Sequence, residues 1–218
     1  MSESKVLVLL SGCGVFDGAE IHESVLTLLS LSRCGASWTI AAPDKDQAHV
    51  IDHHLGQPTE EKRNVRSEAA RIARGPVLDL NEVDCNEFDA IFLPGGFGAA
   101  KNLNTFAFDG AKCSIDEQVE RVLKDFHSAH KPIGAVCIAP TVVARALGLG
   151  TMTIGSNAET AAALEAMGAT HQECSADEIV VDEANRLVTA PAYMCEAPLH
   201  EIATGIDKAV RKLVELAN

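Results

Sequence analysis

Positive charge is scarce in this 218-residue chain, which has 18 lysine and arginine residues against 31 aspartate and glutamate residues. The net charge of −13 argues against binding to nucleic acid or to an anionic membrane, because neutralising phosphates requires a basic face. No apolar run reaches the roughly 18 residues that a membrane-spanning helix needs. We therefore expect neither nucleic acid nor membrane as a partner.

The sequence also lacks any Cys-x-x-Cys pair, although it contains seven cysteines. An odd number without such a pair is not typical of a secreted disulfide framework, so most of them are expected to be small buried residues. Residues 1–5 lead directly into an apolar strand and do not have the shape of a signal peptide. The default expectation is a cytoplasmic protein, with an organellar matrix as the alternative if a presequence has been removed.

Apolar strands and amphipathic helices alternate along the chain, with no repeat, linker or low-complexity segment. Strands are predicted at residues 5–10, 37–42, 90–94, 178–181 and 187–190, and in the apolar run before Cys137. Helices are predicted at residues 19–34, 64–73, 116–130, 160–167 and 197–216. This alternation predicts one α/β domain over residues 1–218, with a mostly parallel sheet covered by helices on both faces.

The first helix carries two conflicting signals. Asp17 is its expected N-cap and Gly35 its expected stop. An apolar stripe on one face, formed by Ile21, Val25, Leu28, Leu29 and Ser32, predicts the buried side. Glu23 lies roughly opposite that stripe, so periodicity alone predicts a solvated position for it. A glutamate in the first turns can nevertheless overhang the strand ends, and His22 beside it is a competing base with a more suitable pKa.

Cys137 lies between a short buried strand and a helix that has Pro140 in its first turn. Sites in open α/β sheets form outside the carboxyl ends of the strands. A sharp strand-to-helix turn lifts a side chain above the sheet edge, and a helix N-terminus is expected to lower the pKa of a thiol there. Cys137 is therefore the candidate nucleophile.

Two glycine-rich turns are expected at the same sheet edge. Residues 11–18 (SGCGVFDG) follow the first strand, but their G-x-G-x-x-x-G spacing differs from the dinucleotide-binding G-x-G-x-x-G, which favours a plain tight turn. Residues 94–98 (PGGFG) follow another buried strand. Their glycines allow a close backbone approach to a ligand, and free N–H groups in such a turn can stabilise an oxyanion.

The histidines do not complete a familiar site. His49, His53 and His54 have no carboxylate or cysteine set that would make a metal site with them, so we expect no metal and no cofactor. His171 and Glu173 form an H-x-E pattern of the kind found in Cys-His-Glu amidotransferases. They follow Cys137 closely rather than lying near the chain end, which leaves an amidotransferase-like hydrolase as an alternative only.

These motifs resemble the ThiJ/PfpI superfamily of class I glutamine-amidotransferase-like proteins. More narrowly, the chain resembles the ElbB glyoxalase family, also called the sigma cross-reacting protein 27A family. The similar segments are residues 11–23 (SGCGVFDGAEIHE), 63–75 (RNVRSEAARIARG), 94–103 (PGGFGAAKNL), 135–140 (AVCIAP) and 189–194 (TAPAYM). The resemblance implies a flavodoxin-like three-layer sandwich with its cysteine at a nucleophile elbow, and a homodimer.

The resemblance also implies roles for four residues. Cys137 would be the nucleophile, Glu23 the acid/base partner, and the backbone N–H groups of Gly96 and Ile138 the oxyanion site. PfpI-type peptidases carry histidine directly after the cysteine, so Ile138 disfavours a peptidase. The implied activity is a cofactor-independent glyoxalase that converts a small reactive aldehyde, glyoxal or methylglyoxal, to glycolate or lactate. A non-catalytic redox-sensing or chaperone-like protein is the main alternative.

Overall fold

The computed structural model describes residues 4–218, and residues 1–3 of the segment weighed above as a signal peptide lie outside it. Within this range the centre is a seven-stranded sheet with the strand order β10-β11-β7-β6-β1-β2-β5. Its strands are β1 (Lys5–Leu9), β2 (Ser37–Ala42), β5 (Leu78–Asp79), β6 (Ala90–Leu93), β7 (Ile133–Val136), β10 (Val180–Asp182) and β11 (Leu187–Ala190). Two small sheets pair β3 (Ile51–Asp52) with β4 (Gln57–Pro58) and β8 (Thr151–Met152) with β9 (Thr170–His171).

The sheet is parallel throughout except at its β10 edge, where β10 runs antiparallel to β11. Strand β1 lies inside the sheet between β2 and β6, with Val6 opposite Trp38 of β2 and Ala90 of β6. The order β2-β1-β6-β7-β11 is the 2-1-3-4-5 order of flavodoxin-like sheets. In this order the second strand is added on one side of the first, and the later strands are added on the other side. The predicted α/β flavodoxin-like class is confirmed.

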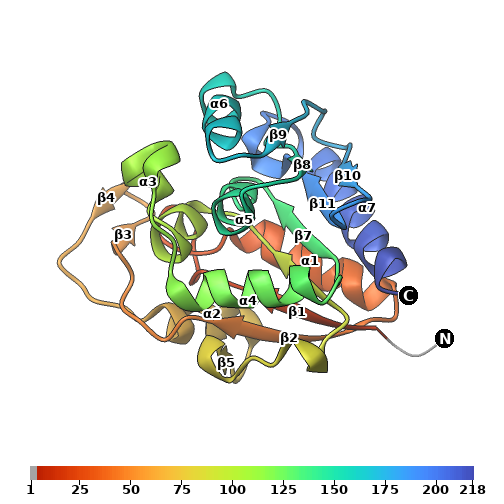
Figure 1. Cartoon of the computed structure of the whole chain (residues 1–218). Coiled ribbons are helices and arrows are strands. Elements are labelled where there is room, and N and C mark those ends of the chain that lie inside the picture. The colour runs from red at the N-terminus through yellow and green to blue at the C-terminus, as the bar shows by residue number, and fades with distance from the viewer. Residues whose placement is uncertain (1–3) are drawn as a thin grey trace.

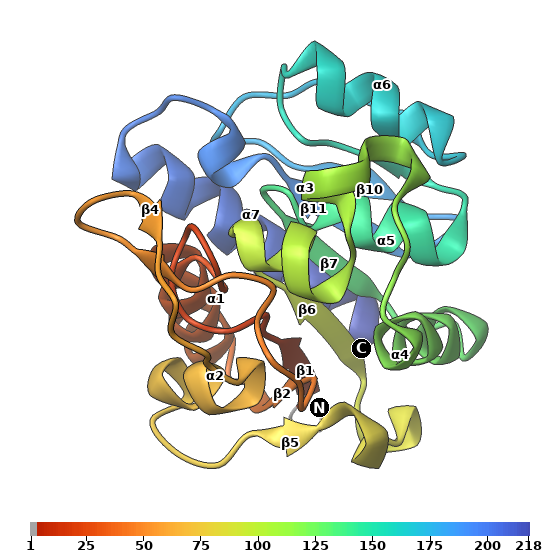
Figure 2. The ribbon, with the colours of Figure 1, turned by 90° about the vertical axis from the view of Figure 1, so that its left-hand side faces the viewer.

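Helices cover both faces of this sheet (Figures 1 and 2). They are α1 (Ile21–Arg33), α2 (Val65–Ala73), α3 (Phe106–Asp109), α4 (Glu117–Ser128), α5 (Pro140–Leu147), α6 (Ala158–Ala166) and α7 (Leu199–Ala217). One core cluster joins the sheet to α4 and α5, and the other joins it to α1, α2 and α7. None of the helices in residues 4–218 is long and apolar enough to cross a membrane.

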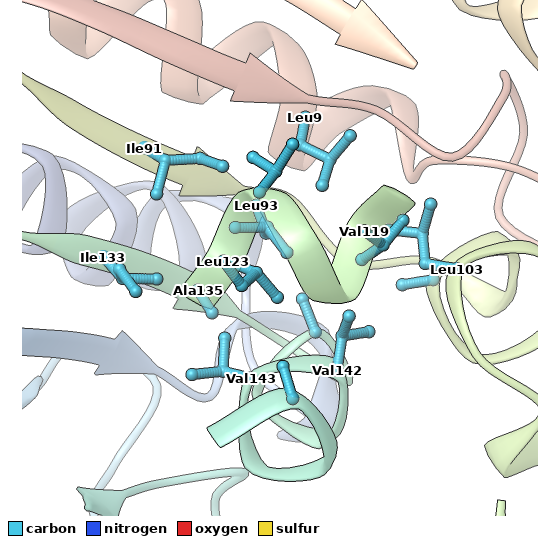
Figure 3. Close-up of a cluster of buried hydrophobic side chains, with 14 of the residues drawn as sticks. Leu9, Ile91, Leu93, Leu103, Val119, Leu123, Ile133, Ala135, Val142 and Val143 are labelled. Carbon is cyan, nitrogen blue, oxygen red and sulfur yellow. The ribbon is translucent and has the colours of Figure 1, made fainter. Parts of the chain in front are cut away.

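The alternation of side chains along the strands builds these two cores. In β1, Leu7 and Leu9 point to the side of α4 and α5, whereas Val6 and Val8 point to the side of α1 and α7. Figure 3 shows the first cluster, in which Leu9 packs with strand and helix residues around α4 and α5. Because β1 is buried on both faces, it reads as a continuous apolar run.

Helix α1 is turned the opposite way from the prediction. The apolar side chains of Ile21, Val25 and Leu29 are 44%, 50% and 42% exposed. The buried face carries four small or polar residues, Glu23, Ser24, Thr27 and Ser30, together with Leu31. Ser24 and Thr27 bury without penalty because their hydroxyls donate to backbone carbonyls one turn earlier, at 2.6 and 2.8 Å. The predicted N-cap is also wrong, because Glu20 and not Asp17 accepts the bond from the first turn.

Gly134 in β7 is so closely packed that a substitution there tests the packing of the core. A Cβ atom on Gly134 would lie 2.4 Å from the Phe92 ring, whereas one on Gly75 would meet nothing within 4 Å. We expect Gly134→Ala to lower the free energy of unfolding by about 1–3 kcal/mol through overpacking. Gly75→Ala is the matched control and should stay within about 0.5 kcal/mol of wild type. Urea unfolding measures both, and equal stabilities would contradict the packing argument.

Candidate active site

Cys137 occupies the turn between β7 and α5. Its φ of 60° is in the left-handed region, which costs a non-glycine residue about 1–3 kcal/mol. The turn is held because the Cys137 N–H donates to the carbonyl of Ala190 at 3.0 Å, the last bond between β7 and β11. The residue is 7% exposed. This strand–turn–helix geometry is the predicted nucleophile elbow.

Glu23 is fully buried, at 0% exposure, and its carboxylate lies next to the Cys137 thiol. One carboxylate oxygen accepts from the Gly95 N–H at 2.8 Å, and the other accepts from the Tyr193 N–H at 3.4 Å. The solvated position predicted from periodicity is therefore wrong, because the face of α1 that carries Glu23 is the buried one. His22 is exposed and its Nδ1 lies 2.7 Å from the Tyr193 hydroxyl. Glu23, rather than His22, lies beside Cys137.

The glycines after β6 allow this contact. A Cβ atom on Gly95 would lie 2.5 Å from the Cys137 Cβ and 2.8 Å from the Glu23 Oε2, so any side chain at residue 95 would push the pair apart. The next residue, Gly96, has a φ of 91° that turns its N–H toward the cysteine. The N–H groups of Gly96 and Ile138 both act on Cys137 in the direction that favours its thiolate form. The structure thus places the two amides expected for an oxyanion site at the candidate nucleophile.

The two glycine-rich turns are bonded to each other. The N–H of Phe97 donates to Val15 at 2.7 Å, and that of Gly98 donates to Gly18 at 2.9 Å. The Asn102 side chain donates to two carbonyls of the first turn, at 2.9 and 2.8 Å. The turn at residues 11–18 therefore supports the loop that carries Gly95 and Gly96, which gives it a structural role at the site.

Burial sets the acidity of the pair. It is the largest cause that raises the pKa of Glu23 to about 7, followed by the negative charge of Glu20. Burial also raises the pKa of the Cys137 thiol well above its usual value, followed by the negative charge of Glu23. The amides of Gly96 and Ile138 act in the opposite direction but are outweighed. The predicted low pKa of an isolated thiol at a helix N-terminus is wrong for this site.

The two acidic groups must therefore be considered together. Once the pair has lost its first proton near pH 7, one proton remains, and it can lie on the sulfur or on the carboxyl. When it lies on the carboxyl, the sulfur is a thiolate that faces two amide donors and a neutral acid. Such an arrangement provides a nucleophile and a proton donor at the same pH.

A cavity of about 350 Å³ opens onto Cys137. Its walls come from the first glycine-rich turn, the loop after β6, α3, α6, and the segment after β11. The lining residues are Val15, Glu20, Gly96, Phe97, Ala100, Phe106, Ala107, Cys137, Ile138, Thr160, Tyr193 and Met194. No histidine is among these described lining residues.

Sequence reasoning missed Glu20 and the segment Ala192–Met194. Glu20 caps α1, because its carboxylate accepts from the Glu23 N–H at 2.7 Å. Tyr193 and Met194 follow β11, whose carboxyl end lies at the same sheet edge as those of β6 and β7. The rule that sites gather at strand ends, applied to β11 as well, would have indicated this segment.

The other predicted histidines lie elsewhere. His171 belongs to β9 and is not part of the cavity wall. His53 connects the β3–β4 hairpin to the first glycine-rich turn: its Nδ1 bonds to the carbonyl of Ile51 at 3.0 Å, and its Nε2 accepts from the Phe16 N–H at 3.3 Å. The tautomer that satisfies both bonds leaves neither ring nitrogen free, which is a structural role.

The flavodoxin-like sheet, the strained elbow and the buried glutamate together define a class of protein with a cysteine–glutamate site at the sheet edge. Residues 4–197 match the DJ-1/PfpI family, and the chain belongs to this family. The superfamily predicted from the motifs is thereby confirmed.

Similar proteins come from animals and bacteria. The chain is 51% identical to the human glutamine amidotransferase-like class 1 domain-containing protein 3, mitochondrial, over 98% of this chain and 83% of the human one. It is 49% identical to the rat ES1 protein homolog, mitochondrial, over 98% and 84%. A crystal structure from Ehrlichia chaffeensis, described as an isoprenoid biosynthesis protein with an amidotransferase-like domain, is 37% identical with a TM-score of 0.90, and the match covers 97% of this chain and 99% of that one.

The coupled pair predicts how the reactivity of Cys137 depends on pH. We expect alkylation by iodoacetamide, followed on the Cys137 peptide by mass spectrometry, to rise with a midpoint near pH 7, where Glu23 ionises. In Glu23→Gln the step near pH 7 should vanish and reactivity should rise only above about pH 9, because burial still raises the pKa of the thiol. A wild-type profile without a step near pH 7 would refute the coupling.

The same measurement isolates Glu20. Since the negative charge of Glu20 raises the pKa of Glu23, Glu20→Gln should move the step to lower pH. The glutamine oxygen can still accept the capping bond, so that α1 keeps its start. Glu117→Gln, an exposed residue of α4, removes the same charge far from the site and should leave the step unmoved. A step that stays in place in Glu20→Gln would contradict the electrostatic role.

Proposed function

We propose that the protein is a cofactor-independent glyoxalase that converts 2-oxoaldehydes to 2-hydroxy acids. The observation that carries this proposal is the buried pair of Cys137 and Glu23, whose sulfur and carboxylate lie side by side next to the amides of Gly96 and Ile138. Addition of a thiol to an aldehyde, and the rearrangement that follows, require an activated thiolate, a nearby acid or base and an oxyanion site. The Cys137–Glu23 pair and the two amides supply all three.

The first step forms a carbon–sulfur bond. Cys137 Sγ adds to the aldehyde carbon while Glu23 holds the proton that the thiol has lost. The N–H groups of Gly96 and Ile138 stabilise the negative charge on the former carbonyl oxygen. That oxygen then takes the proton from Glu23, which gives a neutral hemithioacetal and restores the carboxylate.

The second step moves hydrogen within the substrate. The Glu23 carboxylate removes the proton from the carbon bonded to sulfur, which gives an enediolate, and returns it to the neighbouring carbon. The hydroxyl proton of the hemithioacetal passes to the neighbouring oxygen, so that the first carbon becomes the thioester carbonyl and the second carries the hydroxyl. The first carbon is oxidised and its neighbour is reduced by the same amount, so that no external oxidant is required. Water then cleaves the resulting thioester and releases the 2-hydroxy acid, which is glycolate from glyoxal and lactate from methylglyoxal.

The cavity argues against the hydrolytic alternatives. Cleavage of an amide requires protonation of a leaving amine, a task that cysteine hydrolases give to histidine. The described lining residues include no histidine, Ile138 follows the cysteine, and His171 lies in β9. The free amino acid glutamine also carries a carboxylate, and no lysine or arginine of the described cavity wall is there to bind it.

Turnover of glyoxal by three proteins tests the proposal. Wild type should form glycolate, and Cys137→Ser and Glu23→Gln should each lose at least about 100-fold in kcat/KM, because each removes a group that reacts directly. Cys85→Ser, at a cysteine outside the cavity, controls for the loss of a thiol and should retain activity. Thermal unfolding confirms that the variants fold. Equal activity in all of them would sink the assignment.

We also propose a homodimer that uses the exposed apolar stripe of α1, formed by Ile21, Val25 and Leu29. Val25→Glu should convert the dimer to a monomer in light scattering, because it would bury a charge in the contact. Leu55→Glu, at a 64% exposed leucine after β3, is the matched control. A monomeric wild type, or a dimeric Val25→Glu, would refute the contact.

The names of the human and rat relatives support a mitochondrial rather than a cytosolic location, which cell fractionation tests.

A further inference from the structure

The cavity at Cys137 is large for the smallest 2-oxoaldehydes. Its volume of about 350 Å³ corresponds to roughly ten or more water-sized volumes. Glyoxal or methylglyoxal would fill less than half of it. A substrate that leaves most of an apolar cavity unfilled gains little from burial there, because the driving force scales with the apolar area removed from water.

The walls beyond the reacting atoms are apolar. Val15, Phe97, Phe106, Ala107, Ile138 and Met194 supply them. Polar side chains come from Glu20, Thr160 and Tyr193, and the Glu20 carboxylate is already bonded to the N–H of Glu23. The space next to Cys137 therefore suits an apolar substituent better than a polar one.

Charge narrows the choice further. Among the described residues of the cavity wall there is no lysine, arginine or histidine. Glu20 lines the cavity and Glu23 lies next to Cys137, so that both place negative charge close to the reacting carbon. A phosphate or carboxylate on the substrate would meet repulsion, and the described lining residues include no compensating cation.

We propose that the preferred substrates are 2-oxoaldehydes with an uncharged apolar substituent, of the size of a phenyl ring or a medium-length alkyl chain. The inference rests on the proposed glyoxalase function and specifies its substrate class. The aldehyde end lies at Cys137 with its oxygen toward Gly96 and Ile138, and the substituent lies against Phe97, Phe106 and Met194. The balanced reaction is R–CO–CHO plus water to R–CH(OH)–COOH, for example phenylglyoxal to mandelate.

A substrate series tests the apolar arm. For glyoxals with successively longer alkyl chains, kcat/KM divided by the rate of addition to a small thiol should rise about fourfold per methylene until the cavity is full. Phenylglyoxal should exceed methylglyoxal by about tenfold or more on the same scale. A flat series in an enzyme that turns over glyoxal would overturn the inference and leave the proposed function standing.

A charged analogue, compared with an uncharged one that is substituted at the same ring position, tests the electrostatic arm. Phenylglyoxal with a para-carboxylate should lose about tenfold or more against phenylglyoxal itself, whereas a para-methyl group should cost far less. Equal turnover of the carboxylate would overturn the claim that the cavity rejects anions.

A substitution at one residue of the cavity wall can reduce the volume of the cavity. Ala107 of α3 is exposed yet lines the cavity, so Ala107→Leu fills space without straining the core. This change should lower kcat/KM for phenylglyoxal about tenfold more than for glyoxal. Ala184→Leu, at an exposed alanine between β10 and β11, is the matched control and should leave the ratio unchanged. An unchanged ratio in Ala107→Leu would count against the cavity as the substituent site.

A readout independent of turnover separates the two levels of the proposal. Acetophenone, which lacks the aldehyde, should protect Cys137 from alkylation in wild type and protect less in Ala107→Leu. Protection without turnover of any glyoxal would remove the proposed function and, with it, the assignment of a substrate class. Turnover of glyoxal without protection and without a chain-length dependence would remove the apolar preference alone.

Discussion

The site depends on one contact, between the fully buried carboxyl of Glu23 and the thiol of Cys137. Burial raises the pKa of the carboxyl from its usual range to about 7. Because the folded pKa lies above the unfolded one, the native state loses stability as pH rises from about 4 to 7, by roughly 3 kcal/mol in total. The fold tolerates this cost, which indicates that the proton at this position has a use.

The residues around this contact keep the Cys137 thiol and the Glu23 carboxyl close together. Gly95 has no side chain because a Cβ atom there would touch both Cys137 and Glu23. The elbow at Cys137 keeps an unfavourable φ because its N–H completes the pairing of β7 with β11. Strain, a buried charge and a mandatory glycine occur within one cluster, and each is unfavourable alone. Their concentration at one sheet edge is typical of a functional site.

The fold and half of the site followed from local pattern, and the rest did not. Buried strands are short apolar runs, and the strand order places their ends together, so Cys137 and Gly96 were predictable. Glu23 was placed beside Cys137 only by family resemblance, since periodicity assigned it to solvent. Periodicity failed because Ser24 and Thr27 bond within their own helix and can therefore face the core, while Ile21, Val25 and Leu29 face outward. The spacing of apolar residues along a helix contains no information about such bonds.

The acidity of the cysteine distinguishes between the chemistries that the site could perform. Position at a helix N-terminus predicts a lowered thiol pKa, yet burial and the negative charge of Glu23 raise the thiol pKa instead. A permanent thiolate would react with any electrophile. A thiol that ionises only when Glu23 takes its proton leaves that proton on Glu23, so it favours reactions that need a proton donor beside the sulfur. Addition to an aldehyde needs it on the new oxygen, next to the sulfur. Cleavage of an amide needs it on a departing nitrogen, for which this cavity offers no histidine among its described lining residues. The pair is therefore better matched to carbonyl addition and rearrangement than to hydrolysis.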